Sequence, residues 1–570
     1  MQSSPKFHAS FQAAIFSVAA FLLIFAAGCA PKWQLAPLEP AAPALEADSG
    51  MVVAAHPLAA EAGLSVLRDG GNAIDAAIAT MFVLNVVEPH ASGLGGGGFA
   101  LVRMADGETK VVDYRDRAPR SVDTAWYYDP LDSLKRMRHG GGAVCVPGAA
   151  SGWAELYDSW GTMPLERLTR DAIKYAEEGF PVNPGLSRLI TDYTESVISQ
   201  DSLLAMTFLR DGIPYLPGDT LRQPMLAATF RDLTAKGIRS LYRGPIAEAI
   251  VSAVRSDSGT IAPEDLAFYR AEVIEPLHGT FGKYDLLTVP PPSMGGAALI
   301  EILNLVEATG AMNSGAGTTE SIHLVSQCIQ QAYADAEIRV GDPAIVKTNW
   351  REMLTPEFAR KAMIGIALEA KPAPRQAVPP STSDHGNTTH LVVADMNGNV
   401  ISITQSINYF FGAGVMAGNT GILLNNQMAD FSAMPDSLNI IRPKARPRSF
   451  MTPLIVLDKE KPVLVAGTPG GPRITSTMAQ IALNMLVANM ELNAAIDYPR
   501  FFPVGEHLVL ESRFDKPTVS GLHKAGYQLH LAGPYNLYFG GAHAISLTHN
   551  NGTKLYGSAD KRRGGAARGF

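Results

Sequence analysis

Hydrophobic and polar positions alternate with helical spacing in the first part of the chain. Residues 54–87 combine this spacing with a continuous apolar end, which predicts helices. Two apolar runs, 100–103 and 109–114, flank Ala105-Asp106-Gly107 and predict a hairpin. Helical spacing returns in the middle of the chain, where we expect helices over 163–178, 247–255, 297–307 and 319–336.

The pattern changes to strands after a Pro- and Ala-rich stretch at 370–383, which predicts an exposed linker. The runs 388–395 and 400–406 enclose Asn397-Gly398, a strong hairpin signal. With these two residues as the loop, Thr388 lies opposite residue 407, or opposite 406 or 408 if the register shifts by one. Ser406 and Asn408 are therefore expected beside Thr388.

Two glycine- and proline-rich segments interrupt the predicted elements. Residues 92–99 (SGLGGGGF) lack a following Gly-Lys-Ser/Thr and a clear preceding strand, which argues against a phosphate loop. They predict backbone that packs too closely for side chains, or that lines a pocket. Residues 290–296 (PPPSMGG) predict a rigid turn into the helix over 297–307.

The amino-terminal residues look like a targeting segment. Residues 1–28 carry Lys6, an apolar run over 13–25 that is too short to span a bilayer, and three small residues before Cys29. This pattern resembles a bacterial lipoprotein signal and predicts lipidation of Cys29, in a periplasmic or outer-membrane lipoprotein of the cell envelope. The alternative is simple secretion with a free Cys29. Residues 29–49 are rich in Ala and Pro and predict an extended tether, with folded structure from about Gly50.

Composition narrows the function classes. The 570 residues are 46% hydrophobic and 18% charged, as in a large folded protein. The net charge of -7 and the lack of a long basic run argue against nucleic-acid binding. Three cysteines are too few for a disulfide framework, and Cys145 and Cys328 are expected to pack in the interior. His385 and His390 show no metal-ligand spacing, so we expect neither a metal nor a cofactor.

Thr388 is a candidate nucleophile. A threonine hydroxyl inside a chain is a poor nucleophile and needs a base. A cut between Asn387 and Thr388 would give Thr388 a free amine with a pKa of roughly 7.7–8.0, which can accept the proton. A neighbouring hydroxyl such as that of Ser406 could orient it. On these residues alone, the alternative is that Thr388 merely begins a strand.

Several motifs then occur in order at sensible separations. Residues 388–390 (TTH), 425–431 (NNQMADF) and 468–471 (TPGG), with the two glycine-rich segments, resemble the γ-glutamyltranspeptidase family from about residue 51 to 570. The resemblance implies an α+β fold, the four-layered αββα sandwich of N-terminal nucleophile hydrolases. It also implies a precursor cut before Thr388, giving a large subunit of 50–387 and a small subunit of 388–570.

The resemblance assigns catalytic roles by position. Thr388 matches the nucleophile, and Ser406 stands where the family usually has a threonine that supports it. Gly470 and Gly471 match the pair whose N–H groups form the oxyanion hole, a role that suits glycine because the backbone must come close.

Substrate-binding roles follow in the same way. Arg115, in residues 113–119 (DYRDRAP), matches the arginine that holds the substrate α-carboxylate, a role that suits a planar donor. The residues that match binders of the α-amino group are Asn408, Gln427 and Asp430. Ser449 matches one of two adjacent serines near the carboxylate, but Phe450 replaces the second.

The resemblance implies transfer or hydrolysis of γ-glutamyl compounds such as glutathione, with water, an amino acid or a peptide as acceptor. Because Phe450 replaces a serine, an alternative function remains: that of a related acylase that acts on glutaryl or other γ-linked amides. A third possibility is an envelope binding protein without catalysis, which the presence of Thr388, Arg115 and Asp430 disfavours.

Overall fold

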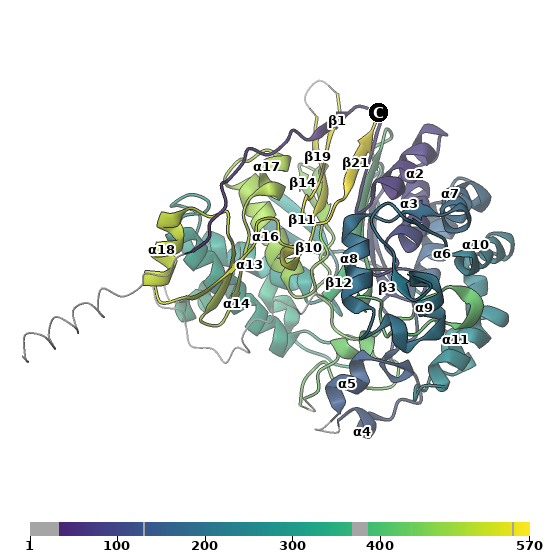
Figure 1. Ribbon diagram of the computed structural model, residues 1–570. Coiled ribbons are helices and arrows are strands. Elements are labelled where there is room, and N and C mark those ends of the chain that lie inside the picture. Colours follow the sequence, from purple (N-terminus) through teal and green to yellow (C-terminus); the bar gives the residue numbers. More distant parts are fainter. Residues whose placement is uncertain (1–32, 129–131, 367–385, 435, 550–551) are drawn as a thin grey trace, which may run out of the picture.

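Two large antiparallel sheets lie face to face, with helices outside each of them (Figure 1). The computed structural model describes residues 33–128, 132–366, 386–434, 436–549 and 552–570. The first sheet contains, in order, β1 (Leu45–Ala47), β20 (Lys554–Ala559), β19 (His543–Thr548), β15 (Lys461–Gly467), β14 (Leu454–Asp458), β11 (Tyr284–Thr288) and β10 (Leu277–Phe281). The second contains β21 (Ala566–Gly569), β2 (Gly50–Ala54), β12 (Gly386–Asp395), β13 (Val400–Tyr409), β3 (Gly97–Arg103), β4 (Thr109–Asp113) and β9 (Glu272–Ile274).

Helices form the two outer layers (Figure 1). The first sheet is covered by α13 (Gly295–Thr309), α14 (Thr319–Arg339), α16 (Arg473–Leu486) and α17 (Leu492–Asp497), with α18 (Lys516–Lys524) further out. Helix α15 (Pro356–Ala362) contacts α13. The second is covered by α2 (Pro57–Arg68), α3 (Ala73–Val87), α6 (Ala149–Trp160), α7 (Leu165–Glu178) and α10 (Pro224–Lys236). The remaining helices on this side are α4 (Thr124–Tyr127), α5 (Ser133–Arg138), α8 (Pro184–Tyr193), α9 (Ser202–Phe208), α11 (Pro245–Arg255) and α12 (Pro263–Ala267).

Smaller sheets lie outside the sandwich. A three-stranded sheet contains β16 (Phe501–Val504), β17 (His507–Glu511) and β18 (Gln528–Ala532). Two short pairs are β5 (Phe180–Pro181) with β8 (Thr220–Leu221), and β6 (Leu209–Arg210) with β7 (Ile213–Pro214).

Side-chain alternation along the strands creates the layers. In β12, Val392 and Ala394 join the cluster between the two sheets, whereas Leu391 and Val393 join the cluster under α2 and α3. Successive side chains of a strand point to opposite faces, so a strand that is buried on both faces is apolar throughout. The predicted α+β, αββα sandwich is therefore confirmed.

The predicted helices and the first hairpin are also confirmed, with small shifts at their ends. The stretch 54–87 contains α2 and α3, and the other four expected helices are α7, α11, α13 and α14. The runs 100–103 and 109–114 correspond to β3 and β4, which pair as predicted. The segment 290–296 leads into α13, whose first two residues are Gly295 and Gly296.

The hairpin of β12 and β13 differs from the predicted register. Ala394 pairs with Val400, so the loop is one residue longer than the expected Asn397-Gly398 pair. Gly398 has φ of 94°, as expected for the left-handed residue that ends a three-residue hairpin loop. Thr389 therefore pairs with Gln405, and Thr388 comes opposite Ser406.

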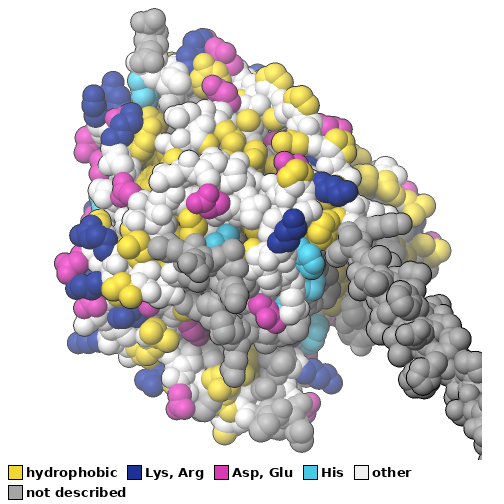
Figure 2. All heavy atoms as spheres, turned by 90° about the vertical axis from the view of Figure 1, so that its left-hand side faces the viewer, with side chains coloured by type: hydrophobic (Ala, Val, Ile, Leu, Met, Phe, Trp, Pro, Cys, Tyr) yellow, Lys and Arg dark blue, Asp and Glu magenta, His cyan; other side chains and the backbone are white. Residues whose placement is uncertain are grey.

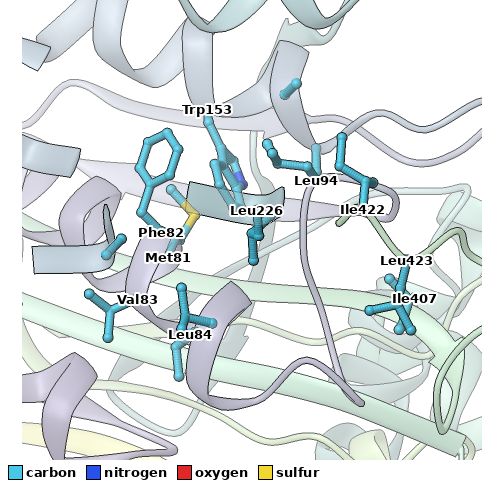
Figure 3. Packing of buried hydrophobic residues seen from close by; sticks show 14 of the residues in the cluster. Met81, Phe82, Val83, Leu84, Leu94, Trp153, Leu226, Ile407, Ile422 and Leu423 are labelled. Atoms are coloured by element: carbon cyan, nitrogen blue, oxygen red, sulfur yellow. The ribbon is translucent and has the colours of Figure 1, made fainter. Parts of the chain in front are cut away.

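Core packing holds the side chains near the end of β13 that point toward the helices (Figure 3). The Trp153 ring meets Phe82 edge-on at 4.9 Å between centroids, and its Nε1 donates to Oε1 of Gln405 at 3.0 Å. Ile407 lies beside Leu423 in the same cluster (Figure 3). Because Gln405 and Ile407 are held on this face, Ser406 between them points toward the opposite side of the sheet.

The glycine-rich segment 92–99 packs against this strand, as the sequence predicted. A Cβ on Gly96 would lie 2.2 Å from the carbonyl oxygen of Ser406, and one on Gly98 would lie 2.4 Å from that of Thr404. Only glycine allows this approach. The segment thus sets the position of the strand that carries Ser406.

The predicted tether is partly wrong. Folded structure begins before Gly50, because β1 pairs with β20, and the Ala36 N–H donates to the Ser512 carbonyl at 2.7 Å. Ala and Pro composition favours an extended chain, but it does not show whether that chain lies on another surface. The signal segment 1–28, Cys29 and the linker 370–383 lie outside the described residues.

Replacing Gly96 tests the close packing against Ser406. Gly96→Ala should destabilise the protein by about 1–3 kcal/mol, because its methyl group overlaps a strand carbonyl. The midpoint of urea unfolding measures the change. Gly533→Ala is the matched control, since a Cβ there meets nothing within 4 Å. Equal midpoints for the two variants would show that the segment is not tightly constrained.

Candidate active site

Thr388 lies at an irregular place near the start of β12. The pairing of β12 with β13 shifts register between Asn387 and Thr389, so the peptide before Thr388 departs from the regular ladder. Such bulges re-aim side chains and are common beside active sites. Thr388 is buried, with 4% of its surface exposed.

The Ser406 hydroxyl connects both sides of the Asn387–Thr388 peptide. The Thr388 hydroxyl donates to Ser406 Oγ at 3.3 Å, and Ser406 in turn donates to the carbonyl oxygen of Asn387. The N–H of Asn408 donates to Ser406 Oγ at 2.7 Å. One hydroxyl thus contacts a candidate nucleophile and polarises the neighbouring carbonyl group.

The Asn387 side chain is fixed by residues that the sequence analysis missed. Its Nδ2 donates to the His90 carbonyl at 2.7 Å, and its Oδ1 accepts from the Thr388 N–H at 3.1 Å and from Arg563. Arg563 is paired with Glu88 at 3.4 Å, and Glu88 accepts from Thr389 Oγ1 at 2.6 Å. Arg563 follows two other basic residues near the end of the chain, so its sequence context indicates only a charged surface.

Arg115 and Asp430, predicted to bind opposite ends of a substrate, form an ion pair with each other, in which Arg115 is buried and 31% of the Asp430 side chain is exposed. Arg115 also donates to the carbonyl oxygens of Pro447, at 3.1 Å, and Arg448, at 2.8 Å. Asp430 belongs to a 3-10 helix, Gln427–Asp430, and the nearby Asn408 side chain acts to lower the pKa of its carboxyl group. A chain of polar contacts therefore runs from Thr388 through Ser406, Asn408 and Asp430 to Arg115.

Burial perturbs the carboxyl groups beside Arg115. Burial raises the pKa of Asp430 above its usual value, although the Arg115 guanidinium opposes the shift. The pKa of Asp116 is raised well above its usual value by burial, again against Arg115. Arg115 Nη1 and both Asp116 carboxyl oxygens have no hydrogen-bond partner among the described residues. Arg115 Nη1 lies 3.9 Å from Asp116 Oδ2, so the two groups form an ion pair that lacks a direct hydrogen bond.

Gln427 begins the 3-10 helix that ends at Asp430, and Ser449 follows a residue whose carbonyl contacts Arg115. Gln427 Oε1 is buried and has no partner within the described part of the chain. Ser449 directly follows Arg448, whose carbonyl accepts from Arg115, and its Oγ accepts from the Met451 N–H at 3.1 Å. The Phe450 ring packs against Tyr333, with centroids 5.7 Å apart.

Gly470 and Gly471 precede the first turn of α16, with φ values of 140° and 55°. The end of β15 brings them to the site, since a Cβ on Gly467 would lie 2.2 Å from the ring of His390. Thr475 of α16 donates to the Phe450 carbonyl at 3.4 Å, which places the helix start beside Ser449. Among the described contacts, no hydrogen bond joins either glycine to Thr388.

The nearby histidines and cysteine have packing roles. Burial lowers the pKa of His390 well below its usual value and that of His543 to about 3, so both stay neutral near pH 7. His390 hydrogen-bonds to Thr404 at 2.8 Å, as the predicted local role requires. Burial raises the pKa of the Cys145 thiol, and Cys328 is also fully buried. No cluster of three or more potential metal ligands occurs in the described residues.

The four-layered sandwich, with a threonine near the start of a central strand, defines the class of N-terminal nucleophile hydrolases. A model of the family described as Gamma-glutamyltranspeptidase matches residues 59–570. The chain belongs to the γ-glutamyltranspeptidase family.

Known relatives include both hydrolases and acylases. The chain is 37% identical over 545 residues to the glutathione hydrolase proenzyme of Bacillus subtilis (strain 168), covering 91% of each chain. It is 36% identical over 490 residues to the Acylase ACY 1 proenzyme of Pseudomonas sp. (strain SE83), covering 84% of this chain and 87% of the relative. The cephalosporin acylase structure from Bacillus halodurans aligns with a TM-score of 0.85 at 29% identity, covering 94% of this chain and 98% of that one.

The contact between Ser406 and the Asn387 carbonyl predicts a role in processing. Ser406→Ala should slow the expected cut before Thr388 by roughly 100-fold, because it removes a hydrogen-bond donor to the Asn387 carbonyl. A time course of precursor and fragments on a denaturing gel measures the rate. Ser406→Thr keeps the hydroxyl and is the control, which should cleave at close to the normal rate. Rapid cleavage of the alanine variant would contradict this role.

Proposed function

We propose that the chain cuts itself between Asn387 and Thr388 and then cleaves γ-glutamyl amides such as glutathione, passing the γ-glutamyl group to water, an amino acid or a peptide. The observation that carries this proposal is the polar chain from Thr388 through Ser406, Asn408 and Asp430 to Arg115. It connects a nucleophile to a pair of opposite charges that suits an amino-acid head group. The relatives named glutathione hydrolase proenzymes support it.

The processing step follows from the contacts at the bulge. Thr388 Oγ attacks the Asn387 carbonyl carbon, while Ser406 stabilises the charge that develops on the oxygen. The C–N bond breaks, the Thr388 nitrogen takes the proton, and an ester joins Asn387 to Thr388 Oγ. Water then hydrolyses the ester, leaving an Asn387 carboxylate and a free Thr388 amine and hydroxyl. The products are a large subunit that ends at Asn387 and a small subunit of 388–570.

Turnover uses the same hydroxyl. The Thr388 amine accepts the hydroxyl proton as Oγ attacks the γ-carbonyl of the substrate, and the N–H groups of Gly470 and Gly471 stabilise the oxyanion. The amine product leaves with a proton, and a γ-glutamyl ester remains on Thr388. Water or an acceptor amine then attacks this ester and restores the free threonine.

Substrate binding requires Arg115 and Asp430 to exchange partners. The substrate carboxylate takes the place of Asp430 on Arg115, and the substrate ammonium takes the place of Arg115 on Asp430. Each buried charge keeps an opposite charge beside it, so the exchange avoids leaving either group unpaired. Asn408 and Gln427 supply amide oxygens for the ammonium, and Ser449 lies beside the carboxylate.

The proposal includes an envelope location. Residues 1–28 act as a lipoprotein signal, and Cys29 becomes the lipidated first residue of the mature chain. The bacterial relatives named proenzymes fit an enzyme that is matured after synthesis. Among the described residues, no helix has the length and apolar character needed to cross a bilayer.

Processing can be tested directly. The purified protein should separate under denaturing conditions into two fragments, and the small one should begin at Thr388. Thr388→Ala should stay a single chain, because it lacks the attacking hydroxyl. Amino-terminal sequencing and intact mass measure both results. A small fragment that begins at another residue would contradict the proposed nucleophile.

Substrate recognition is tested with two substrates that differ by one group. Asp430→Ala should lower kcat/KM for a γ-glutamyl anilide by about 100-fold, or roughly 3 kcal/mol, because the substrate ammonium loses its counter-charge. A glutaryl anilide lacks that ammonium and should be affected far less. Asp436→Ala, an exposed carboxylate on the same segment, is the matched control. Equal losses on both substrates would assign Asp430 a structural role.

A second candidate function is an acylase for glutaryl or similar amides. Phe450 favours this candidate. It follows Ser449 at the position where the family commonly has a second serine, and its ring packs on Tyr333. This change removes a hydroxyl donor from the carboxylate end of the site. The relatives named acylases at 35–36% identity are consistent with this candidate.

Phe450→Ser separates the two candidates. Restoring the hydroxyl should raise kcat/KM for the γ-glutamyl anilide several-fold if this residue faces the carboxylate, since one added hydrogen bond is worth about 0.5–1.5 kcal/mol. A parent enzyme that prefers the glutaryl anilide, and a variant that does not reverse this preference, would support the acylase.

A further inference from the structure

Residues 33–47, predicted as a free tether, lie along the surface of the folded body (Figure 1). Trp33 meets His523 edge-on, with ring centroids 5.7 Å apart, and Leu35 packs on the cluster under the first sheet. The Ala36 N–H donates to the Ser512 carbonyl at 2.7 Å, and Asn493 Nδ2 donates to the Ala42 carbonyl at 2.7 Å. We call residues 33–47 the strap.

The strap ends as a strand at the edge of the first sheet. In β1, Leu45 pairs with Gly557 and Ala47 pairs with Leu555 of β20. The Lys554 ammonium lies 3.0 Å from the Glu46 carboxylate just beside this pairing. The described strand pairs, hydrogen bonds and ion pairs of the strap all lead to residues between 493 and 570, within the proposed small subunit.

The strap leaves little free chain next to Cys29. Ala30, Pro31 and Lys32 are the only residues between Cys29 and Trp33. Four chain steps of at most 3.6 Å reach about 14 Å, whereas a free tether running to Gly50 would reach about 76 Å. A lipid on Cys29 would therefore hold the surface around Trp33 close to the membrane.

We propose that the strap docks the face around α18 onto the lipid surface that holds Cys29. The inference rests on the lipid anchor included in the proposed function. The face comprises α18, with His523 and Lys524 exposed, and the nearby strands β17 and β18, where His507 and His530 contact each other at 2.9 Å. Figure 2 views the molecule from this side and shows basic, acidic and apolar side chains interspersed. The short distance that residues 30–32 can span identifies this face as the one nearest the lipid, and an excess of positive or negative side chains does not.

The strap also has a consequence for the processed enzyme. A cut before Thr388 would leave the strap on the large subunit, while its described strand-pairing, hydrogen-bond and ion-pair partners would belong to the small subunit. The segment that carries the anchor would thus bind the small subunit directly, without a covalent link. The lipid surface would hold both subunits through one contact.

The docking is tested with cysteines placed at the two ends of the molecule. Lys524→Cys lies on α18, and Lys236→Cys lies on α10 at the opposite end (Figure 1). The native Cys145 and Cys328 are fully buried and will not compete for a fluorescent label. The full-length lipidated protein is labelled and bound to vesicles of phosphatidylethanolamine and phosphatidylglycerol that contain a quencher lipid.

Quenching should be several-fold greater at Lys524→Cys than at Lys236→Cys. Adding Trp33→Ala and Leu35→Ala should release the strap and reduce this difference. Similar quenching at both positions, or protein that does not float with the vesicles, would overturn the inference. Turnover of the γ-glutamyl anilide is read in the same samples and should not change on strap release. Loss of turnover with the quenching difference intact would count against the proposed activity and not against the docking.

Discussion

The site depends on one hydroxyl group, that of Ser406, which bonds to both sides of the peptide between Asn387 and Thr388. The bulge between β12 and β13 accompanies these contacts: Thr388 alone stands opposite two residues of β13, Ser406 and Ile407. The position of Ser406 depends in turn on its neighbours. Trp153 holds Gln405 on one face, and Gly96 allows a glycine loop to press against the strand from the side.

Around this hydroxyl, charged side chains are paired in or near the interior. Arg115 and Asp430 form one pair, and Arg563 and Glu88 form another beside Asn387. Burying charges costs free energy, and such pairs contribute little net stability compared with apolar packing. These ion pairs instead fix the positions of neighbouring groups. Each fixes a group next to the peptide that we propose is cut or next to the proposed substrate head, and removing one partner would leave a charge unpaired.

The fold joins two parts of the chain that processing would separate. The two central sheets each combine strands from before and after Thr388, as β2 pairs with β12 and β11 pairs with β14. The strap extends this interlocking to the outside of the molecule. A cut at one peptide bond therefore leaves the hydrophobic interface between the proposed subunits intact, since its apolar surface remains buried.

The sequence by itself determined the element types, the strand hairpin and, through a set of ordered motifs, the αββα class. These features depend on the local spacing of apolar residues and on turn-forming residues, such as the Asn397-Gly398 pair that indicates a hairpin. It also identified Thr388, Ser406, Asn408, Asp430 and Arg115 as candidates by resemblance. Only the tertiary structure decided the bulge and the true register, the direct pairing of Arg115 with Asp430, the contacts of Arg563 with Asn387, and the docking of the strap. The reason is physical: these features join residues far apart in the chain, and a local pattern holds no information on which distant group will meet it.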